Sequence, residues 1–344
     1  MTFLVLILSF LMGGGSLALA AGARDQVLNA QLNAVEAQRV STEAADQVNH
    51  VQAPPVQPAN ETIEPPLRPV GTNAPSHWVH DIFFSNRQPL NPRRVHTLEI
   101  GSGPYYYLYR EPSAGVKNTG VMTQYTVNYT YRPPDGNILN NAIFNMYRLD
   151  NRFAFGTLSY KGSGTDRNDN YNYEVRVLLG KDYLMAGRSL LTPYLGFGYR
   201  YLLDKGDGII TSSGNYGYDR HSNYYYLPIG FTASIPYKAW TTDINLEYDV
   251  FINGLQVSDL SDGNRFGFNN PNIHNGQHSG YGIRGSFKLL YDTPTLGFYI
   301  EPYVRFWSIE QSHAVSAVVD GSLGNFVEPA NTTLESGLEL GLQF

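Results

Sequence analysis

Charged side chains recur at every second position in several segments of the chain, and they are the residues best placed to carry chemistry. Asp243, Glu247 and Asp249 alternate with apolar residues, and Arg284 and Lys288 do so in a later segment. A period of two places alternate side chains on one face of a β-strand. If such strands close into a membrane barrel, the polar face lines the lumen. The predicted lumen-lining residues are Glu99, Arg132, Glu174, Arg176, Arg200, Asp243, Glu247, Asp249, Arg284, Lys288, Glu301, Arg305, Glu335 and Glu339.

Both signs of charge occur on this face, together with the bulky Tyr299, Tyr303 and Trp307. A barrel of about ten strands leaves little free space in its interior, and buried charges need partners. The favoured interpretation is therefore a network of ion pairs that fills and orders the barrel. The alternative is a narrow porin-like channel for small solutes, in which the same charges set the selectivity.

Two histidine-containing segments bear on enzymatic chemistry. Asp219 and His221 could form an acid–histidine pair, but their parity matches that of Tyr225, which puts them on the lipid side unless a bulge intervenes. His274 and His278 have the spacing of a helical metal site, yet the Asn- and Gly-rich segment 253–279 favours a solvated loop. We therefore predict a protein that is not an enzyme, with no catalytic residue, no metal site and no cofactor.

Ten segments with a period of two are expected to be the strands that position the charged residues. The last is the clearest, because Leu338, Leu340 and Leu342 alternate with Glu339 and Gly341. The third alternates poorly, which leaves its register open. The predicted strands are 96–110, 120–132, 146–160, 171–183, 191–203, 222–235, 241–252, 280–291, 296–309 and 332–344.

The connections between these segments alternate in length. Short links are expected at 184–190, 236–240 and 292–295, and long polar loops at 204–221, 253–279 and 310–331. In outer-membrane barrels the short turns face the periplasm and the long loops face outward. The short connection 111–119 and the long one 133–145 fit this rule less well.

Two runs of three tyrosines, Tyr105–Tyr107 and Tyr224–Tyr226, lie near predicted strand ends. Aromatic girdles form at both membrane interfaces, because the ring prefers the headgroup layer while its hydroxyl stays hydrated. We interpret both runs as parts of such girdles; the alternative is that they reflect aromatic β-propensity alone.

The composition limits the class of protein. The chain of 344 residues has a mean hydropathy of -0.28, which excludes a bundle of apolar membrane helices. Its formal net charge of -6 argues against nucleic acid as a partner. Because the chain contains no Cys, thiolate metal sites, cysteine nucleophiles and a lipoprotein anchor are also excluded.

The N-terminal part of the chain differs from the rest. Residues 1–20 are predicted to be an export signal, with an apolar run from Phe3 to Met12 and an Ala-x-Ala cleavage site that ends at Ala20. Residues 21–95 are predicted to be a periplasmic Ala- and Gln-rich segment, disordered or partly helical, followed by a Pro-rich linker. Residues 21–75 are a candidate contact segment for a periplasmic partner. The barrel is expected to occupy residues 96–344.

The terminal sequence Leu340-Gly341-Leu342-Gln343-Phe344 resembles the C-terminal signature of Gram-negative outer-membrane barrels, and the alternating strands resemble the small barrels of the OmpA-like and omptin-like proteins. The resemblance implies an outer-membrane location, an assembly signal at Leu340, Leu342 and Phe344, and barrel-assembly machinery, membrane lipid and lipopolysaccharide as partners. The predicted fold is all-β, a closed antiparallel transmembrane β-barrel of about ten strands. The predicted role is structural or surface contact; an omptin-like hydrolase is the least favoured alternative.

Overall fold

The computed structural model describes residues 94–133, 143–185, 188–266, 269–293 and 295–344, all of which belong to the compact unit Ala74–Phe344. The predicted export signal and almost all of the predicted segment 21–95 lie outside the described residues. Among the described residues, no helix has the length and apolar character needed to cross a membrane.

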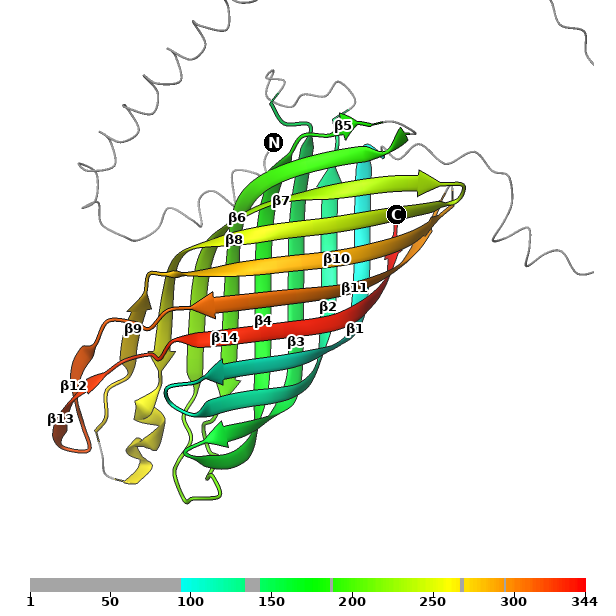
Figure 1. Cartoon of the computed structure of the whole chain (residues 1–344). Coiled ribbons are helices and arrows are strands. Elements are labelled where there is room, and N and C mark those ends of the chain that lie inside the picture. Colours follow the sequence, from blue (N-terminus) through cyan, green and yellow to red (C-terminus); the bar gives the residue numbers. More distant parts are fainter. Residues whose placement is uncertain (1–93, 134–142, 186–187, 267–268, 294) are drawn as a thin grey trace, which may run out of the picture. The chain divides into compact units, whose positions relative to one another are not determined.

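Ten antiparallel strands form one closed barrel (Figure 1). Each strand pairs with the next along the chain, and β14 pairs with β1 to close the sheet, for example through Leu342 opposite Ile100. The barrel strands are β1 (His96–Glu111), β2 (Val116–Tyr131), β3 (Met146–Gly162), β4 (Gly164–Gly180), β6 (Leu190–Lys205), β7 (Arg220–Tyr237), β8 (Trp240–Ser258), β10 (Gly280–Asp292), β11 (Gly297–Ile309) and β14 (Asn331–Gln343).

The prediction of a ten-stranded barrel is confirmed, and the differences lie at strand ends. β4 begins at Gly164, seven residues before the predicted start at 171, and β8 continues to Ser258, six residues beyond 252. Both extensions lie at the end of the barrel that carries the long loops. Asn168 and Asn170 of β4 are buried there among polar side chains. On β4 apolar alternation is missing because this part of the wall does not divide a lumen from lipid. On β8 the alternation is interrupted by the register shift opposite Tyr225 and Tyr226 and resumes with the exposed Leu255 and the buried Gln256.

The two ends of the barrel differ in their connections. One end, here called the long-loop end, carries the connections 112–115, 163, 206–219, 259–279 and 310–330; the other, the short-turn end, carries 132–145, 181–189, 238–239 and 293–296. The long-loop end also holds the 3-10 helix η3 (Leu260–Phe266), strand β9 (Ile273–Gln277) beside β8, and the hairpin of β12 (Val315–Val319) and β13 (Ser322–Phe326). The small strand β5 (Tyr183–Leu184) pairs with β6 at the short-turn end.

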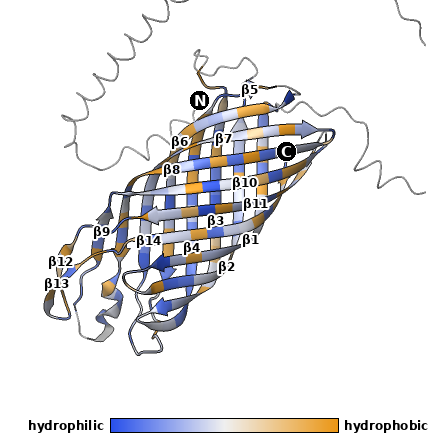
Figure 2. Cartoon of the chain, in the orientation of Figure 1, coloured by the Kyte–Doolittle hydropathy of each residue, from blue (hydrophilic) through white to orange (hydrophobic). Residues whose placement is uncertain are grey.

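The barrel wall is apolar outside and polar inside. Val121 of β2 points outward and is 63% exposed, whereas Gln124 on the inner face of the same strand is fully buried. Figure 2 shows hydrophobic and hydrophilic residues alternating along the barrel strands. A soluble protein does not expose apolar residues around its whole circumference. The outer wall is therefore a lipid-facing surface.

The two tyrosine runs do not lie wholly in the interfaces. Tyr105, Tyr107, Tyr224 and Tyr226 point into the barrel and are at most 2% exposed, while only Tyr106 and Tyr225 point outward. The girdle prediction was wrong for the first four. Consecutive strand residues alternate between faces, so a run of three cannot lie on one side.

Candidate functional site: a charged network inside the barrel

The fourteen residues predicted to line the lumen are all buried or half-buried in the barrel. They come from strands around the whole wall. Glu99 lies on β1, Arg132 just after β2, Glu174 and Arg176 on β4, Arg200 on β6, Asp243, Glu247 and Asp249 on β8, Arg284 and Lys288 on β10, Glu301 and Arg305 on β11, and Glu335 and Glu339 on β14.

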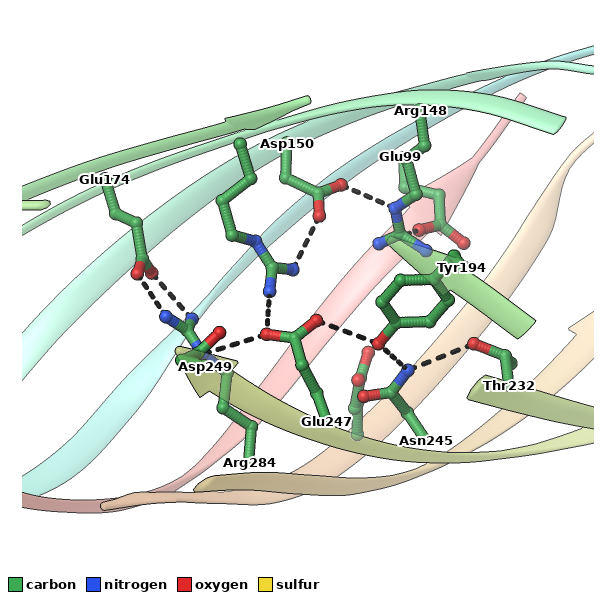
Figure 3. A network of polar contacts seen from close by, with 12 residues as sticks. Glu99, Arg148, Asp150, Glu174, Tyr194, Thr232, Asn245, Glu247, Asp249 and Arg284 are labelled. Carbon is green, nitrogen blue, oxygen red and sulfur yellow. Dashed lines mark hydrogen bonds and ion pairs between the residues drawn. The ribbon is translucent and has the colours of Figure 1, made fainter. Parts of the chain in front are cut away.

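Arg284 lies at the centre of one cluster, surrounded by three carboxylates (Figure 3). Its terminal nitrogens donate to the two oxygens of Glu174 at 2.9 and 2.5 Å. Its Nε donates to Oδ2 of Asp249 at 2.6 Å and lies 3.1 Å from Oε1 of Glu247. The hydroxyl of Tyr226 donates to Glu174 at 2.6 Å. Such charge-assisted contacts hold the guanidinium in one orientation.

A second set of contacts extends this cluster toward the short-turn end. Arg176 donates to Glu247 and to Asp150, each at 2.6 Å, and Arg148 donates to the other oxygen of Asp150 at 2.5 Å. On the other side, the hydroxyl of Tyr194 donates to Glu247 at 2.8 Å. Together with the contacts of Arg284, these interactions join six strands across the interior, namely β3, β4, β6, β7, β8 and β10.

Glu335 is the centre of a separate cluster. It lies 2.7 Å from Nη2 of Arg152 and 2.9 Å from Nη2 of Arg200, and it is 1% exposed. Arg305 lies farther away, at 3.6 Å. Beside this cluster, Gln124 accepts a hydrogen bond from Nε of Arg152 at 2.8 Å. Glu335 thus neutralises two deeply buried guanidinium groups.

Lys288 forms the third cluster, at the short-turn end. Its Nζ contacts both oxygens of Glu99 at 3.0 Å and Oε2 of Glu301 at 3.2 Å. These residues line a cavity of about 160 Å³, to which Asp243 and Arg132 also contribute. Arg132 contacts Asp182 at 3.0 Å. The remaining lumen-facing acid, Glu339, accepts from Gln124, Thr126 and Tyr299 at 2.7–2.8 Å.

Sequence reasoning missed Arg148, Asp150 and Arg152, which line the interior on β3. Their spacing of two residues was a usable signal. It was masked because Asn151, on the outer face between them, is polar, so the strand lacks clean apolar alternation. Gln124 and Tyr226 were missed for other reasons. Gln124 carries no charge, and only charged residues were assigned to the network, whereas Tyr226 was assigned to an interfacial girdle.

Toward the long-loop end the interior is filled by an aromatic belt, made of Tyr107, Tyr109, Tyr224, Tyr226 and Trp307. The indole of Trp307 packs edge-on against Tyr226 with a centroid distance of 4.9 Å, and Arg200 stacks over the indole at 5.4 Å. Trp307 and Arg200 are each 1% exposed. Such cation–π packing in a desolvated site is favourable. The belt lies between the charged clusters and the long loops.

Beyond the belt, a cavity of about 510 Å³ opens at the long-loop end. It shares no lining residue with the cavity at the short-turn end. At its base Arg220 contacts both Glu111 and Glu328 at 2.7 Å, and Tyr109 donates to the same two acids. Burial, together with the charge of Glu111, raises the pKa of Glu328, although Arg220 opposes this. The guanidinium of Arg220 thus forms ion pairs with two carboxylates.

The structure places the four histidine-segment candidates away from the lumen. His221 faces outward, where one ring nitrogen contacts Asp259 at 2.7 Å and the other contacts the hydroxyl of Tyr201 at 2.6 Å. Asp219 instead accepts from the backbone of Asp207. A register shift between β7 and β8 occurs at Tyr225 and Tyr226, too far along to turn His221 inward.

The segment predicted to be a solvated loop is partly ordered. His274 belongs to β9, and both it and His278 are exposed. The prediction of a loop was wrong for residues 273–277, which extend the sheet beside β8. Across the part of the chain that the structure describes, no group of three His, Cys, Asp or Glu side chains is arranged to hold a metal ion.

The predicted assembly residues lie on the outer face of the last strand. Leu340, Leu342 and Phe344 are 57%, 36% and 47% exposed. The backbone of Phe344 exchanges two hydrogen bonds with Leu98, at 2.8 and 3.2 Å. The end of the chain therefore takes part in closing the barrel.

A closed antiparallel sheet with an apolar outer wall and a charged interior satisfies every backbone group in a bilayer. The described part of the chain is a transmembrane β-barrel. No family model matches the chain, and no curated protein matches its sequence.

Solved outer-membrane barrels resemble it in architecture. The outer membrane protease OmpT from Escherichia coli aligns with a TM-score of 0.46 and 10% identity, over 72% of this chain and 96% of that one. The translocator domain of the autotransporter NalP from Neisseria meningitidis aligns with a TM-score of 0.33 and 10% identity, over 72% of this chain and 88% of that one. The transport unit of the autotransporter AIDA-I from Escherichia coli aligns with a TM-score of 0.35 and 11% identity, over 78% of this chain and 97% of that one. These likenesses concern the barrel alone.

Proposed function

We propose that this barrel does not conduct and is not an enzyme, and that it serves a structural and surface-contact role in the outer membrane. The observation that carries the proposal is the filled interior. Arg200, Tyr226 and Trp307 are at most 1% exposed and pack on one another across the lumen. Conduction through a barrel requires a continuous polar path, which this packing interrupts.

The contact surface in this proposal is the long-loop end, directed outward from the cell, with the N-terminal segment in the periplasm. The cavity of about 510 Å³ lies there and falls within the size range of ligand pockets. Its walls include Tyr160, Tyr218 and Phe326, and its base holds the Glu111–Arg220–Glu328 cluster. Aromatic walls over a buried polar base are typical of recognition surfaces.

Single-channel conductance of the refolded full chain in a planar bilayer tests the proposal. A heat-dependent gel shift first establishes that the barrel is folded. We expect no openings from the wild type. The double variant Tyr226→Ala/Trp307→Ala, which removes two side chains of the aromatic belt, should produce them. The matched control Tyr225→Ala/Phe298→Ala removes two outward aromatics and should stay silent.

Steady, ion-selective openings from the wild type would overturn the proposal in favour of the narrow channel. The charged lining of the interior is the observation that favours this second candidate, and charge-neutralising variants of Lys288 and Glu301 should then change the selectivity.

The absence of catalysis is a separate part of the proposal. Both ring nitrogens of His221 are engaged, by Asp259 and Tyr201, on the outer side of the wall. Peptide or ester hydrolysis by the purified barrel that is lost on substitution of His221→Ala would show that this part is wrong.

A further inference from the structure

The cavity at the long-loop end, with a volume of about 510 Å³, brings three acidic side chains together with one basic side chain. The acids are Glu111, Asp204 and Glu328, and Arg220 is the only Lys, Arg or His residue among the described residues that line the cavity. The balance of charge by itself would favour a cationic ligand. Which groups are left for a ligand, however, depends on the hydrogen bonds that these side chains already form.

All three carboxylates are engaged by other groups of the chain. Glu111 and Glu328 each contact Arg220 at 2.7 Å, and their side chains are 3% and 4% exposed. Both oxygens of Asp204 accept hydrogen bonds from side-chain amides. The amides are those of Asn118, Asn168 and Asn170, at 2.8, 3.1 and 3.2 Å. A cation that leaves water for a cavity needs a carboxylate as its partner, and here the carboxylates are covered or already bonded.

Two polar atoms of the cavity lining have no such partner. Among the described residues, no group donates a hydrogen bond to Oδ1 of Asn168 and none accepts one from Nε of Arg220. Asn168 is 7% exposed, so its carboxamide is largely cut off from bulk water. Both residues lie beside the same acid, since Asn168 donates to Asp204 and Arg220 stands opposite Asp204 in the pairing of β6 with β7.

One atom of this pair is an acceptor and the other is a donor. An ammonium or guanidinium group offers only donors and a carboxylate offers only acceptors, so neither pairs with both atoms. A hydroxyl group is a donor and an acceptor at once. Buried polar atoms in proteins are paired as a rule, and a ligand with several neighbouring hydroxyl groups matches this pair.

The walls of the cavity supply a second kind of contact. Tyr160, Tyr218 and Phe326 line it, and each of these residues is half-buried. The ring of a saccharide carries hydroxyl groups around its edge and C–H groups on its faces. The C–H faces pack on aromatic rings, while the edge bonds to polar side chains. An apolar ligand would make the first contact only and would leave the polar base unpaired.

We propose that this cavity binds a soluble, uncharged saccharide. Asn168 and Arg220 bond to its hydroxyl groups, and Tyr160 and Phe326 pack on its ring faces. The ligand enters from the long-loop end and not through the lipid-facing wall. This inference rests on the surface-contact role proposed above for the long-loop end, and it names the chemical class of the partner.

The test begins with a screen of the refolded full chain against an array of immobilised neutral and anionic glycans. The neutral glycan that binds most tightly is then titrated in solution by calorimetry, with spermidine and an arginine dipeptide as cationic probes. The detergent must itself carry no sugar, so a zwitterionic amine oxide takes the place of maltosides and glucosides. We expect saturable binding of the neutral glycan and no binding of the cationic probes.

Two variants remove the two kinds of contact separately. Asn168→Ala removes the carboxamide and should weaken binding about tenfold, which is the effect of about one hydrogen bond. Tyr160→Ala/Phe326→Ala removes two aromatic walls and leaves the polar base intact, and it should weaken binding by about tenfold or more. A heat-dependent gel shift establishes that each variant is folded.

Each variant has a matched control outside the cavity. Asn325→Ala removes an exposed carboxamide on β13, and Tyr125→Ala/Phe153→Ala removes two outward aromatic side chains of the barrel wall. None of these residues lines the cavity. Both controls should bind the neutral glycan as the wild type does.

The proposal is overturned if no neutral glycan binds the wild type in a saturable way, if the anionic glycans or the cationic probes bind more tightly than every neutral glycan, or if the variant without the two aromatic walls binds as the wild type does. Conductance tests the proposed role independently of these outcomes. A barrel that is silent in the bilayer and binds no saccharide keeps the proposed role and loses only this ligand.

Discussion

Removal of the charge of Glu335 should cost this barrel a large part of its stability. The variant Glu335→Gln keeps the volume of the side chain and its position on β14, so the change is electrostatic. In the wild type the carboxylate contacts Arg152 at 2.7 Å and Arg200 at 2.9 Å, and all three groups are almost fully buried.

The magnitude follows from what the two guanidinium groups would keep. Arg200 has no other ion pair among the described residues and retains only its stacking on Trp307. Arg152 retains a hydrogen bond to the neutral Gln124. Removal of one partner from a buried ion pair leaves an uncompensated charge and costs about 3–5 kcal/mol. We expect a loss of free energy of unfolding in that range.

Urea-dependent unfolding and refolding in lipid vesicles, followed by tryptophan fluorescence, measures this free energy; the indole of Trp307 lies next to Arg200 and reports on the site. The control is Glu310→Gln, at an exposed residue just after β11, which should change stability by less than about 0.5 kcal/mol. If the free energy of unfolding of Glu335→Gln lies within about 1 kcal/mol of the wild-type value, the ion pairs of Glu335 contribute much less to stability than we infer.

Three further changes test other parts of the structure. Burial raises the pKa of Glu328, so the folded state holds the carboxyl proton more tightly than the unfolded chain does. The stability that this proton contributes is present below the ordinary pKa of a glutamate and is lost as the pH rises through the raised pKa. Glu328→Gln should therefore flatten this part of a plot of stability against pH. In Gly198→Ala the new methyl carbon would lie 2.2 Å from the ring of Tyr226, so denaturation should show a loss of about 1–3 kcal/mol, whereas Gly263→Ala meets no neighbour and should be neutral. Phe344→Ala keeps the backbone hydrogen bonds that close the barrel, so a lower yield of folded protein in the outer membrane would isolate the role of the aromatic ring, and an unchanged yield would contradict an assembly signal there.

The barrel itself could be predicted from the sequence because a period of two is a strong signal when it recurs in ten segments. Strands bounded by lipid on one side and charges on the other show the signal most clearly, as in Ile244, Leu246 and Tyr248 against Glu247 and Asp249. The signal fades wherever the environments of the two faces become alike. That happens in the part of β4 that precedes Tyr171, where both faces are polar, and on β3 at Asn151.

The sequence could not show which residues meet across the interior. Arg220 contacts Glu111 and Glu328, which are 109 and 108 residues away along the chain, and no local pattern encodes those separations. The hairpin of β12 and β13 is different, since its turn, Asp320-Gly321, is a well-known hairpin signal. Both turn residues have positive φ, 50° and 74°. It was hidden inside a segment assigned as a loop because of its length.

The charged interior has a role even if its ion pairs add little net stability. Buried ion pairs can be replaced by apolar residues at no cost in some proteins. Here such a replacement would make the two faces of each strand chemically alike. A slip of one residue in strand pairing exchanges the faces, and it would place Arg200, Arg284 and Glu335 against lipid. Each Arg or Lys at the bilayer midplane costs about 2–4 kcal/mol. The interior charges therefore destabilise every strand pairing that is shifted by one residue. The network in Figure 3 thus specifies the fold in two ways, by stabilising the native register and by destabilising the shifted ones.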